Sequence, residues 1–182
     1  MPEIETRRLL MRAYTKADAD AHLRVVSEPE FGRYFPPPPA FHPSRDSVLV
    51  GIGRIIEHWY QFGYGVWALE LKEEARFVGY CGLRRHAPTD EVELLYGVER
   101  PLWRAGLVTE AARASLRYGF EQMKFARVMA VTHPQNTGSR RVMEKAGLRY
   151  EKDAVYFEMN CVYYAVNRGD FRADDAPYAL RP

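Results

Sequence analysis

The 182-residue sequence predicts one mixed α/β domain, spanning residues 1–182, whose sheet is mostly antiparallel but contains one parallel strand pair. Three apolar segments, at 65–71, 77–83 and 92–98, are separated by charged or proline-containing turns, which favours an antiparallel meander. A long amphipathic segment at 107–123 then precedes another apolar segment at 127–132. A helical crossover of this kind allows the strands on either side of it to lie parallel.

The remaining elements are predicted from the residues at their boundaries. Residues 7–14 suggest a first strand, and Thr15 should cap a helix that runs to about Ser27. After an irregular stretch, Ser44 should cap a second helix, which ends near Gly63. The last expected elements are a helix from about Thr137 and strands between Glu151 and Asn167.

The composition argues against several classes of protein. With 47% hydrophobic and 27% charged residues, the chain has an ordinary globular composition and lacks an apolar run long enough to span a membrane. The N-terminal residues lack the apolar core of a signal peptide, so we expect a cytoplasmic protein. Cys81 and Cys161 are too few for a disulfide framework, and no Cys or His cluster has zinc spacing, so no metal is expected. The net charge of +2 is too small to indicate nucleic-acid binding.

A short basic loop at 100–106 joins the strand at 92–98 to the helix that begins at Leu107. A helix N-terminus carries a partial positive charge and unpaired N–H groups, so an anion, most often a phosphate, can bind there. The loop alone is equally compatible with an ordinary strand-to-helix connection. A phosphorylated ligand is the first hypothesis, and a second motif favours it.

Two motifs in this order make the sequence resemble the GNAT acyltransferases, and in particular the branch of the ribosomal-protein N-terminal acetyltransferases. The first, W-R-A-G-L-V-T-E-A at 103–111, is similar to the W-G-K-G-Y-A-T-E-A of that branch. The second, N-T-G-S-R-R-V-M-E-K-A-G-L at 136–148, is similar to N-x-x-S-x-x-x-x-E-K-x-G-F. The resemblance runs from Thr6 to about Asp170. It implies a parallel strand pair that splays apart, helices on both faces of the sheet, and acetyl-coenzyme A as co-substrate.

The resemblance also implies which residues bind this co-substrate, with two departures from the family pattern. Arg104 stands where glycine is common, so a left-handed backbone there would cost about 1–2 kcal/mol, which contact of its guanidinium with phosphate could offset. Val108 replaces a small residue where the backbone approaches phosphate. The implied binding residues are Leu95, Tyr96, Gly97, Val98, Trp103, Arg104, Ala105, Gly106, Leu107, Val108, Thr109, Asn136 and Ser139.

Acetyl transfer to an amine needs a polarised thioester carbonyl and a proton for the departing thiolate. The resemblance assigns polarisation to a backbone amide within 95–98, where Gly97 either allows close approach of the backbone or only relieves crowding. It assigns the proton donor to Ser139, because Met143 occupies the position at which other members of the superfamily have a tyrosine. Alternatively, Ser139 is a helix-end serine bonded to its own backbone. Asn136 is expected to bind the pantetheine arm or a water, to cap the helix, or both.

Glu93 is the leading candidate for the base that deprotonates the amine. Side-chain alternation places it on a strand that otherwise reads as buried, and burial raises the pKa of a carboxyl group. The alternative is a structural charge paired with Arg84 or Arg85. His86 and His133 lie beside turn prolines and are expected to be solvated loop residues.

The acceptor pocket of this fold is walled partly by the connection between the first two helices. In this sequence the connection is rich in aromatic residues and proline, and Tyr34 and Phe35 are the predicted wall residues. A surface loop packed on the core is the alternative. With Glu93 close by, the expected substrate is a primary amine, either a protein N-terminus or a small molecule.

Two other functions remain open from the sequence. A non-catalytic module that binds or senses acyl-coenzyme A would explain the departures at Arg104, Val108 and Met143. Another nucleotide-binding protein is disfavoured because the glycines of G-x-x-x-x-G-K-[ST] and G-x-G-x-x-G are absent. A homodimer is left open, and no nucleic-acid or membrane partner is expected.

Overall fold

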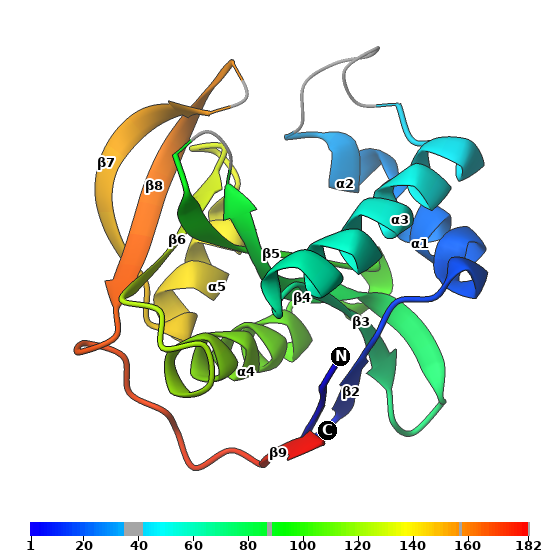
Figure 1. The fold of residues 1–182 in the computed structure, drawn as a ribbon. Coiled ribbons are helices and arrows are strands. Elements are labelled where there is room, and N and C mark those ends of the chain that lie inside the picture. Colours follow the sequence, from blue (N-terminus) through cyan, green and yellow to red (C-terminus); the bar gives the residue numbers. More distant parts are fainter. Residues whose placement is uncertain (35–41, 87–88, 157, 182) are drawn as a thin grey trace.

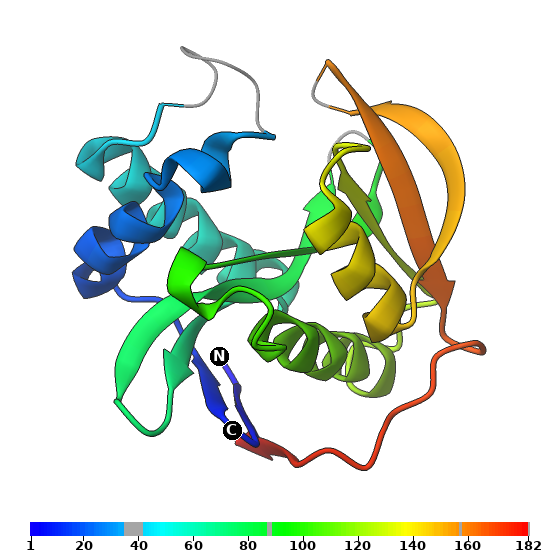
Figure 2. The ribbon, with the colours of Figure 1, turned by 180° about the vertical axis from the view of Figure 1, so that it is seen from behind.

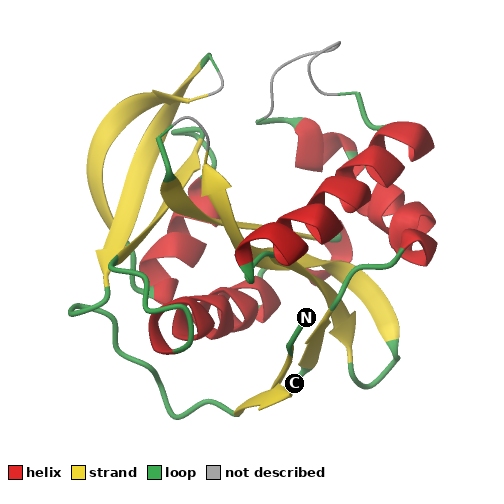
Figure 3. Ribbon diagram, in the orientation of Figure 1, coloured by secondary structure: helices red, strands yellow, loops and turns green. Residues whose placement is uncertain are grey.

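The computed structural model describes residues 1–34, 42–86, 89–156 and 158–181. They form a central sheet with helices on both faces, as predicted (Figures 1 and 3). The elements follow in the order β1 (Glu3–Thr6), β2 (Leu9–Arg12), η1 (Lys16–Asp18), α1 (Ala19–Val26), α2 (Pro29–Gly32), α3 (Arg45–Phe62), β3 (Val66–Leu71), β4 (Arg76–His86), β5 (Glu91–Val98), η2 (Arg100–Leu102), α4 (Leu107–Glu121), β6 (Arg127–Thr132), α5 (Thr137–Ala146), β7 (Arg149–Tyr156), β8 (Met159–Asn167) and β9 (Tyr178–Arg181), where η marks a 3₁₀ helix.

The strand order is β7-β8-β6-β5-β4-β3-β2-β1-β9. The predicted meander of β3, β4 and β5 is confirmed, and so is the parallel pairing of β5 with β6 across the α4 crossover. The other neighbouring strands of the described residues run antiparallel. The β5–β6 register consists of Glu93 opposite Met129, so the two strands diverge beyond this point.

Two layers of helices bury the two faces of the sheet. Helices α1, α2 and α3 lie on one face and α4 and α5 on the other (Figures 1 and 2). On the first face Ile52 of α3 packs in a cluster with Phe77 of β4. On the second face Leu116 of α4 and Met143 of α5 share a cluster with Leu94 of β5. Strand β5 therefore has a helical layer on each side, which places its residues at the centre of the molecule.

The helix boundaries agree with the capping signals. The Ser44 hydroxyl accepts from the N–H of Ser47 at 3.2 Å and begins α3, and Gly63, with φ of 72°, ends it. The N–H of Thr15 donates to Asp18 at 2.8 Å at the start of η1. The Asn136 carboxamide caps α5. Side-chain chemistry within a few residues is enough to set these ends.

The predicted strand at 7–14 is confirmed as β2, which covers Leu9–Arg12, whereas β1 before it was not predicted. The chain turns after Thr6, whose hydroxyl oxygen accepts a hydrogen bond from the N–H of Leu9 at 3.1 Å, and β1 and β2 form a hairpin. Strand β9 was not predicted; it pairs with β1 after segment 168–177 has passed along α4 (Figure 2). Helix α4 ends at Glu121, two residues before the predicted end at Met123. Among the helices of the described ranges, none has the length and apolarity of a membrane span.

Candidate functional site

The divergence of β5 from β6 leaves backbone groups of β5 facing away from β4. The N–H of Glu99 donates to the carbonyl of Val78 at 2.9 Å. In an antiparallel ladder, residue pairs joined by backbone hydrogen bonds alternate with pairs that are not. Gly97 lies two residues before Glu99, so its N–H and carbonyl groups also face β4. The N–H groups of Tyr96 and Val98 consequently point toward the divergence, which we call the fork: residues 95–98 of β5 on the side of β6. Tyr96 thus provides an amide suited to polarising a carbonyl group.

The side of Gly97 that lacks a Cβ is filled by aromatic rings. A Cβ at this position would lie 2.7 Å from Phe31 Cε2 and 2.8 Å from Tyr80 Cε1. Glycine therefore relieves crowding here, which was the alternative the sequence left open. The carbonyl of Val98, by contrast, accepts a hydrogen bond from the Trp103 indole N–H at 2.9 Å. That bond ties the following loop to the end of β5.

The loop leads into a helix N-terminus that no described side chain caps. Gly106 occupies the N-cap position of α4 with φ of 80°, and the first-turn residues Leu107, Val108 and Thr109 follow directly. Their N–H groups and the helix dipole make this end a site for an anion. Arg104 does adopt a left-handed backbone, with φ of 64°, so the strain foreseen at this position is present. Its side chain lies in an exposed part of the loop.

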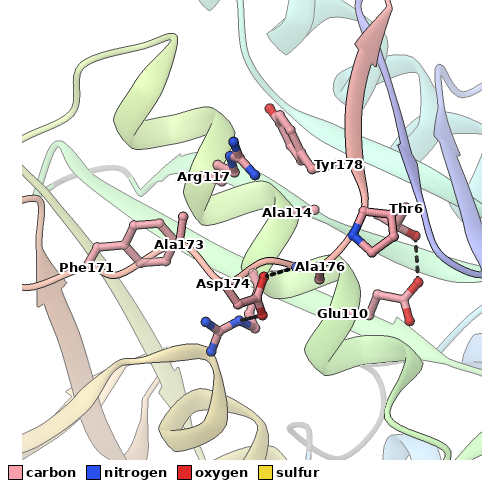
Figure 4. Close-up of a pocket in the computed structure, with 11 residues that line it drawn as sticks. Thr6, Glu110, Ala114, Arg117, Phe171, Ala173, Asp174, Ala176 and Tyr178 are labelled. Carbon is pink, nitrogen blue, oxygen red and sulfur yellow. Dashed lines mark hydrogen bonds and ion pairs between the residues drawn. The ribbon is translucent and has the colours of Figure 1, made fainter.

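Arg8 and Glu110 fix the back of this loop. The Arg8 guanidinium donates to the carbonyl of Ala105 at 2.8 Å and to the carboxylate of Glu110 at 2.8 Å. The Glu110 carboxylate also accepts from the Thr6 hydroxyl at 2.7 Å (Figure 4). These contacts hold the loop from the side of the β1–β2 hairpin. Sequence reasoning missed Arg8, which lies beside Arg7 near the start of the segment that resembles the family.

At the fork, two hydroxyl groups from different elements meet. Ser139 lies in the first turn of α5, where its N–H donates to the Asn136 carboxamide oxygen at 3.1 Å. Its Oγ lies 2.9 Å from the Tyr96 hydroxyl, which is also 3.0 Å from the Ser139 carbonyl oxygen. Burial raises the pKa of the Tyr96 phenol. The Ser139 hydroxyl therefore has a partner on β5, and Met143, one turn later, is buried in the core.

Glu93 is buried, with 4% of its surface exposed, but the predicted rise of its pKa was wrong. Burial alone would raise the pKa of this carboxyl group. The hydrogen bond from His86 and the positive charge of Arg84 outweigh that effect and lower the pKa. The Arg84 Nε lies 2.7 Å from Glu93 Oε2, and the His86 Nδ1 lies 3.4 Å from the same oxygen. The ion pair with Arg84, the alternative interpretation, is thus the arrangement observed, while Arg85 pairs with Asp90.

His86 and His133 were expected to be solvated loop residues, but both rings contact other side chains. His86 is buried within β4 and touches Glu93. The His133 ring, on the connection after β6, stacks on Tyr34 with 5.5 Å between ring centroids. Tyr34 thus joins the end of the α2 segment to the far side of the fork. Phe35, the other predicted wall residue, lies outside the described residues.

A small pocket on the other side of α4 does not belong to this site. It has a volume of about 30 Å³, room for water but not for a coenzyme, and Figure 4 shows it between α4 and the C-terminal segment. Its lining includes Glu110 but none of the predicted site residues. In the described part of the chain, no three His, Cys, Asp or Glu side chains gather as metal ligands.

A parallel strand pair that diverges, connected by a helix with an uncapped N-terminus, is the arrangement that the resemblance to the GNAT acyltransferases implied. The family model described as an acetyltransferase (GNAT) domain matches residues 8–149, which is most of the sequence. The chain therefore belongs to the GNAT acetyltransferase family.

Two curated relatives come from Bacillus subtilis. The N-acetyltransferase YoaA is 28% identical over 173 residues, which cover 91% of this chain and 94% of YoaA. The protein YkkB is 39% identical over 94 residues, which cover 50% of this chain and 55% of YkkB. The first of these matches spans nearly the whole of both chains.

Solved structures share the fold. A GNAT acetyltransferase from Bacillus anthracis has a TM-score of 0.77 at 25% identity, covering 92% of this chain and 99% of that one. The ribosomal-protein-S5-alanine acetyltransferase of Vibrio fischeri has a TM-score of 0.76 at 14% identity, covering 93% and 98%. AAC(6')-Ib, solved in complex with acetyl-coenzyme A, has a TM-score of 0.73 at 14% identity, covering 90% and 95%.

Proposed function

We propose that this protein transfers the acetyl group of acetyl-coenzyme A to a primary amine by direct attack of the amine in a ternary complex. The observation that carries the proposal is the fork: the Tyr96 amide points into it, the Ser139 hydroxyl lies 2.9 Å from the Tyr96 hydroxyl, and the uncapped end of α4 follows β5 in the chain. One extended thioester that ends in phosphates could contact all three.

Each residue has a separate part in this reaction. The first-turn amides of α4 and the Arg104 side chain would hold the pyrophosphate. The Tyr96 N–H would donate to the thioester oxygen as negative charge develops on it; a single donor of this kind contributes about 3 kcal/mol to lowering a barrier. The Ser139 hydroxyl would give its proton to the departing sulfur.

Glu93 fits the recognition of the amine better than its deprotonation. Its pKa is lowered, so the carboxylate stays ionised at neutral pH and is a weak base. An ionised carboxylate still attracts an ammonium group, which then loses its proton to water before attack. The rate should therefore rise with pH until the amine is uncharged.

The identity of the acceptor is part of the proposal, because the fold alone does not determine it. The acceptor would be a protein N-terminus or a small-molecule amine, with the buried Glu93 carboxylate and the Tyr34 ring that stacks on His133 as its proposed contacts. The two cysteines of the chain are both free and buried, which is consistent with a reducing, cytoplasmic location.

The proposal is tested by measuring both the binding of acetyl-coenzyme A and its turnover with an amine. Calorimetry should show binding of acetyl-coenzyme A in the micromolar range, and thiol release should be measured with peptides, polyamines and amino acids as acceptors. Ser139→Ala should lower kcat and leave the Kd of acetyl-coenzyme A unchanged. The matched control is Ser115→Ala, which removes a serine hydroxyl bonded to Ala111 within α4. Binding without turnover on any amine would instead indicate the non-catalytic acyl-coenzyme A module.

A further inference from the structure

The Tyr96 hydroxyl lies within hydrogen-bond distance of two oxygens of the same residue. It is 3.0 Å from the Ser139 carbonyl oxygen and 2.9 Å from Ser139 Oγ. A phenol carries a single hydrogen, so it can donate to one of these oxygens at a time. The pair therefore has two hydrogen-bond arrangements that share the same heavy-atom positions.

The two arrangements point the serine proton in different directions. When Tyr96 donates to the Ser139 carbonyl, the serine O–H can donate to the phenol oxygen, and its proton faces β5. When Tyr96 donates to Oγ instead, the serine O–H is released to point elsewhere, including toward a sulfur atom in the fork. Rotation of the two hydroxyl hydrogens, with no movement of a heavy atom, is enough to exchange them.

We propose that Tyr96 is the positioning residue of this site, whose phenolic O–H, by donating to Ser139 Oγ, directs the serine proton to the sulfur that leaves. This inference rests on the proposed function and adds a side-chain role for Tyr96. It also explains how the site works with Met143 in place of a hydroxyl-bearing residue, because β5 supplies a phenol to the same end of α5.

The step balances with Tyr96 protonated throughout. The C–N bond forms, the C–S bond breaks, and the sulfur takes the bonding electron pair. The Oγ proton moves to this sulfur while the phenolic hydrogen bond stabilises the charge left on Oγ. Water that has accepted the proton of the amine returns one to Oγ. Burial raises the pKa of Tyr96, which fits a group that donates a hydrogen bond but keeps its proton.

The variants are Tyr96→Phe, Ser139→Ala and the double variant, each made in the full chain. Tyr118→Phe is the matched control, because it removes a tyrosine hydroxyl bonded to the carbonyl of Gly63 at 3.0 Å, on α4 and outside the fork. Tyr96→Phe should lower kcat by about tenfold with KM for acetyl-coenzyme A unchanged. The double variant should be no slower than Ser139→Ala, because the two hydroxyls act as one unit. Losses that multiply would overturn the inference.

A second measurement separates positioning from a merely structural role. The thiol pKa of bound coenzyme A, read from the ultraviolet absorbance of its thiolate, should rise in Tyr96→Phe and Ser139→Ala and stay unchanged in Tyr118→Phe. Fluorotyrosine at position 96, a stronger donor that keeps the ring, should lower it. An unchanged thiol pKa in both position-96 proteins would refute the role of Tyr96 even if turnover occurs. Failure of the unmodified protein to bind coenzyme A would instead refute the proposed function and the inference with it.

Discussion

Replacing Glu110 with alanine should destabilise the fold, because this carboxylate joins α4 to the β1–β2 hairpin. Its side chain is 13% exposed and accepts from the Thr6 hydroxyl at 2.7 Å, the Arg8 N–H at 2.8 Å and the Arg8 guanidinium at 2.8 Å. Each of the first two bonds contributes about 1 kcal/mol. The guanidinium is 42% exposed, so its ion pair contributes only about 0.5 kcal/mol.

Together these terms predict a loss of about 2–3 kcal/mol, or a fall in the melting temperature of about 5–10 °C for a chain of this size. The assay is thermal unfolding followed by circular dichroism. The control is Glu121→Ala on the same helix, because the Glu121 side chain is 42% exposed and its ion pair, with Arg117 one turn away, stays within the helix. The control should melt within about 1–2 °C of the native protein. If Glu110→Ala had the same melting temperature as the control, the argument that these hydrogen bonds of Glu110 stabilise the fold would be refuted.

Two further predictions concern the loop and the buried carboxylate. Gly106→Asp should weaken binding of acetyl-coenzyme A about tenfold more than Gly106→Asn, because both share the strain of a φ of 80° and differ in charge at the anion site; equal Kd values in calorimetry would place the phosphates elsewhere. Because the pKa of Glu93 is lowered in the folded state, its carboxylate stabilises the fold above the ordinary carboxyl pKa of about 4.3, and this is lost as pH falls through the lowered pKa. Glu93→Gln should therefore flatten the acid side of the stability profile in urea unfolding, and parallel profiles would show that the ion pair with Arg84 contributes nothing.

The parts of the fold that were predictable from the sequence have local causes. Ser44 and Gly63 bound α3 through contacts within a few residues, and the strand-helix-strand order around α4 requires a crossover. Strand β9 could not be predicted, because four half-exposed or exposed residues form a strand only when the edge of β1 is beside them. Whether such a segment forms a strand depends on its pairing with a distant part of the chain and not on its own sequence pattern.

The same distinction applies to the site. The motif identified Ser139 and the loop around Gly106, but the pKa of Glu93 depends on which β4 side chains lie across from it. Alternation along β5 placed Glu93 correctly on a buried strand, whereas the contact with His86 follows from the register of two strands. The Tyr96 phenol was missed for a similar reason, because nothing in the sequence shows that the first turn of α5 packs against it.

The two ends of the described chain lie side by side, with Glu3 opposite Arg181 and Thr6 opposite Tyr178 (Figure 1). A mechanical force applied through these ends would load the backbone bonds between β1 and β9 one after another, as in unzipping, instead of shearing them all at once. Strands β2, β3 and β4 separate this pair from β5 in the sheet. The terminal strands could therefore peel away under tension while the fork stays assembled, so that single-molecule extension would give a first, low-force step that does not disturb the candidate site.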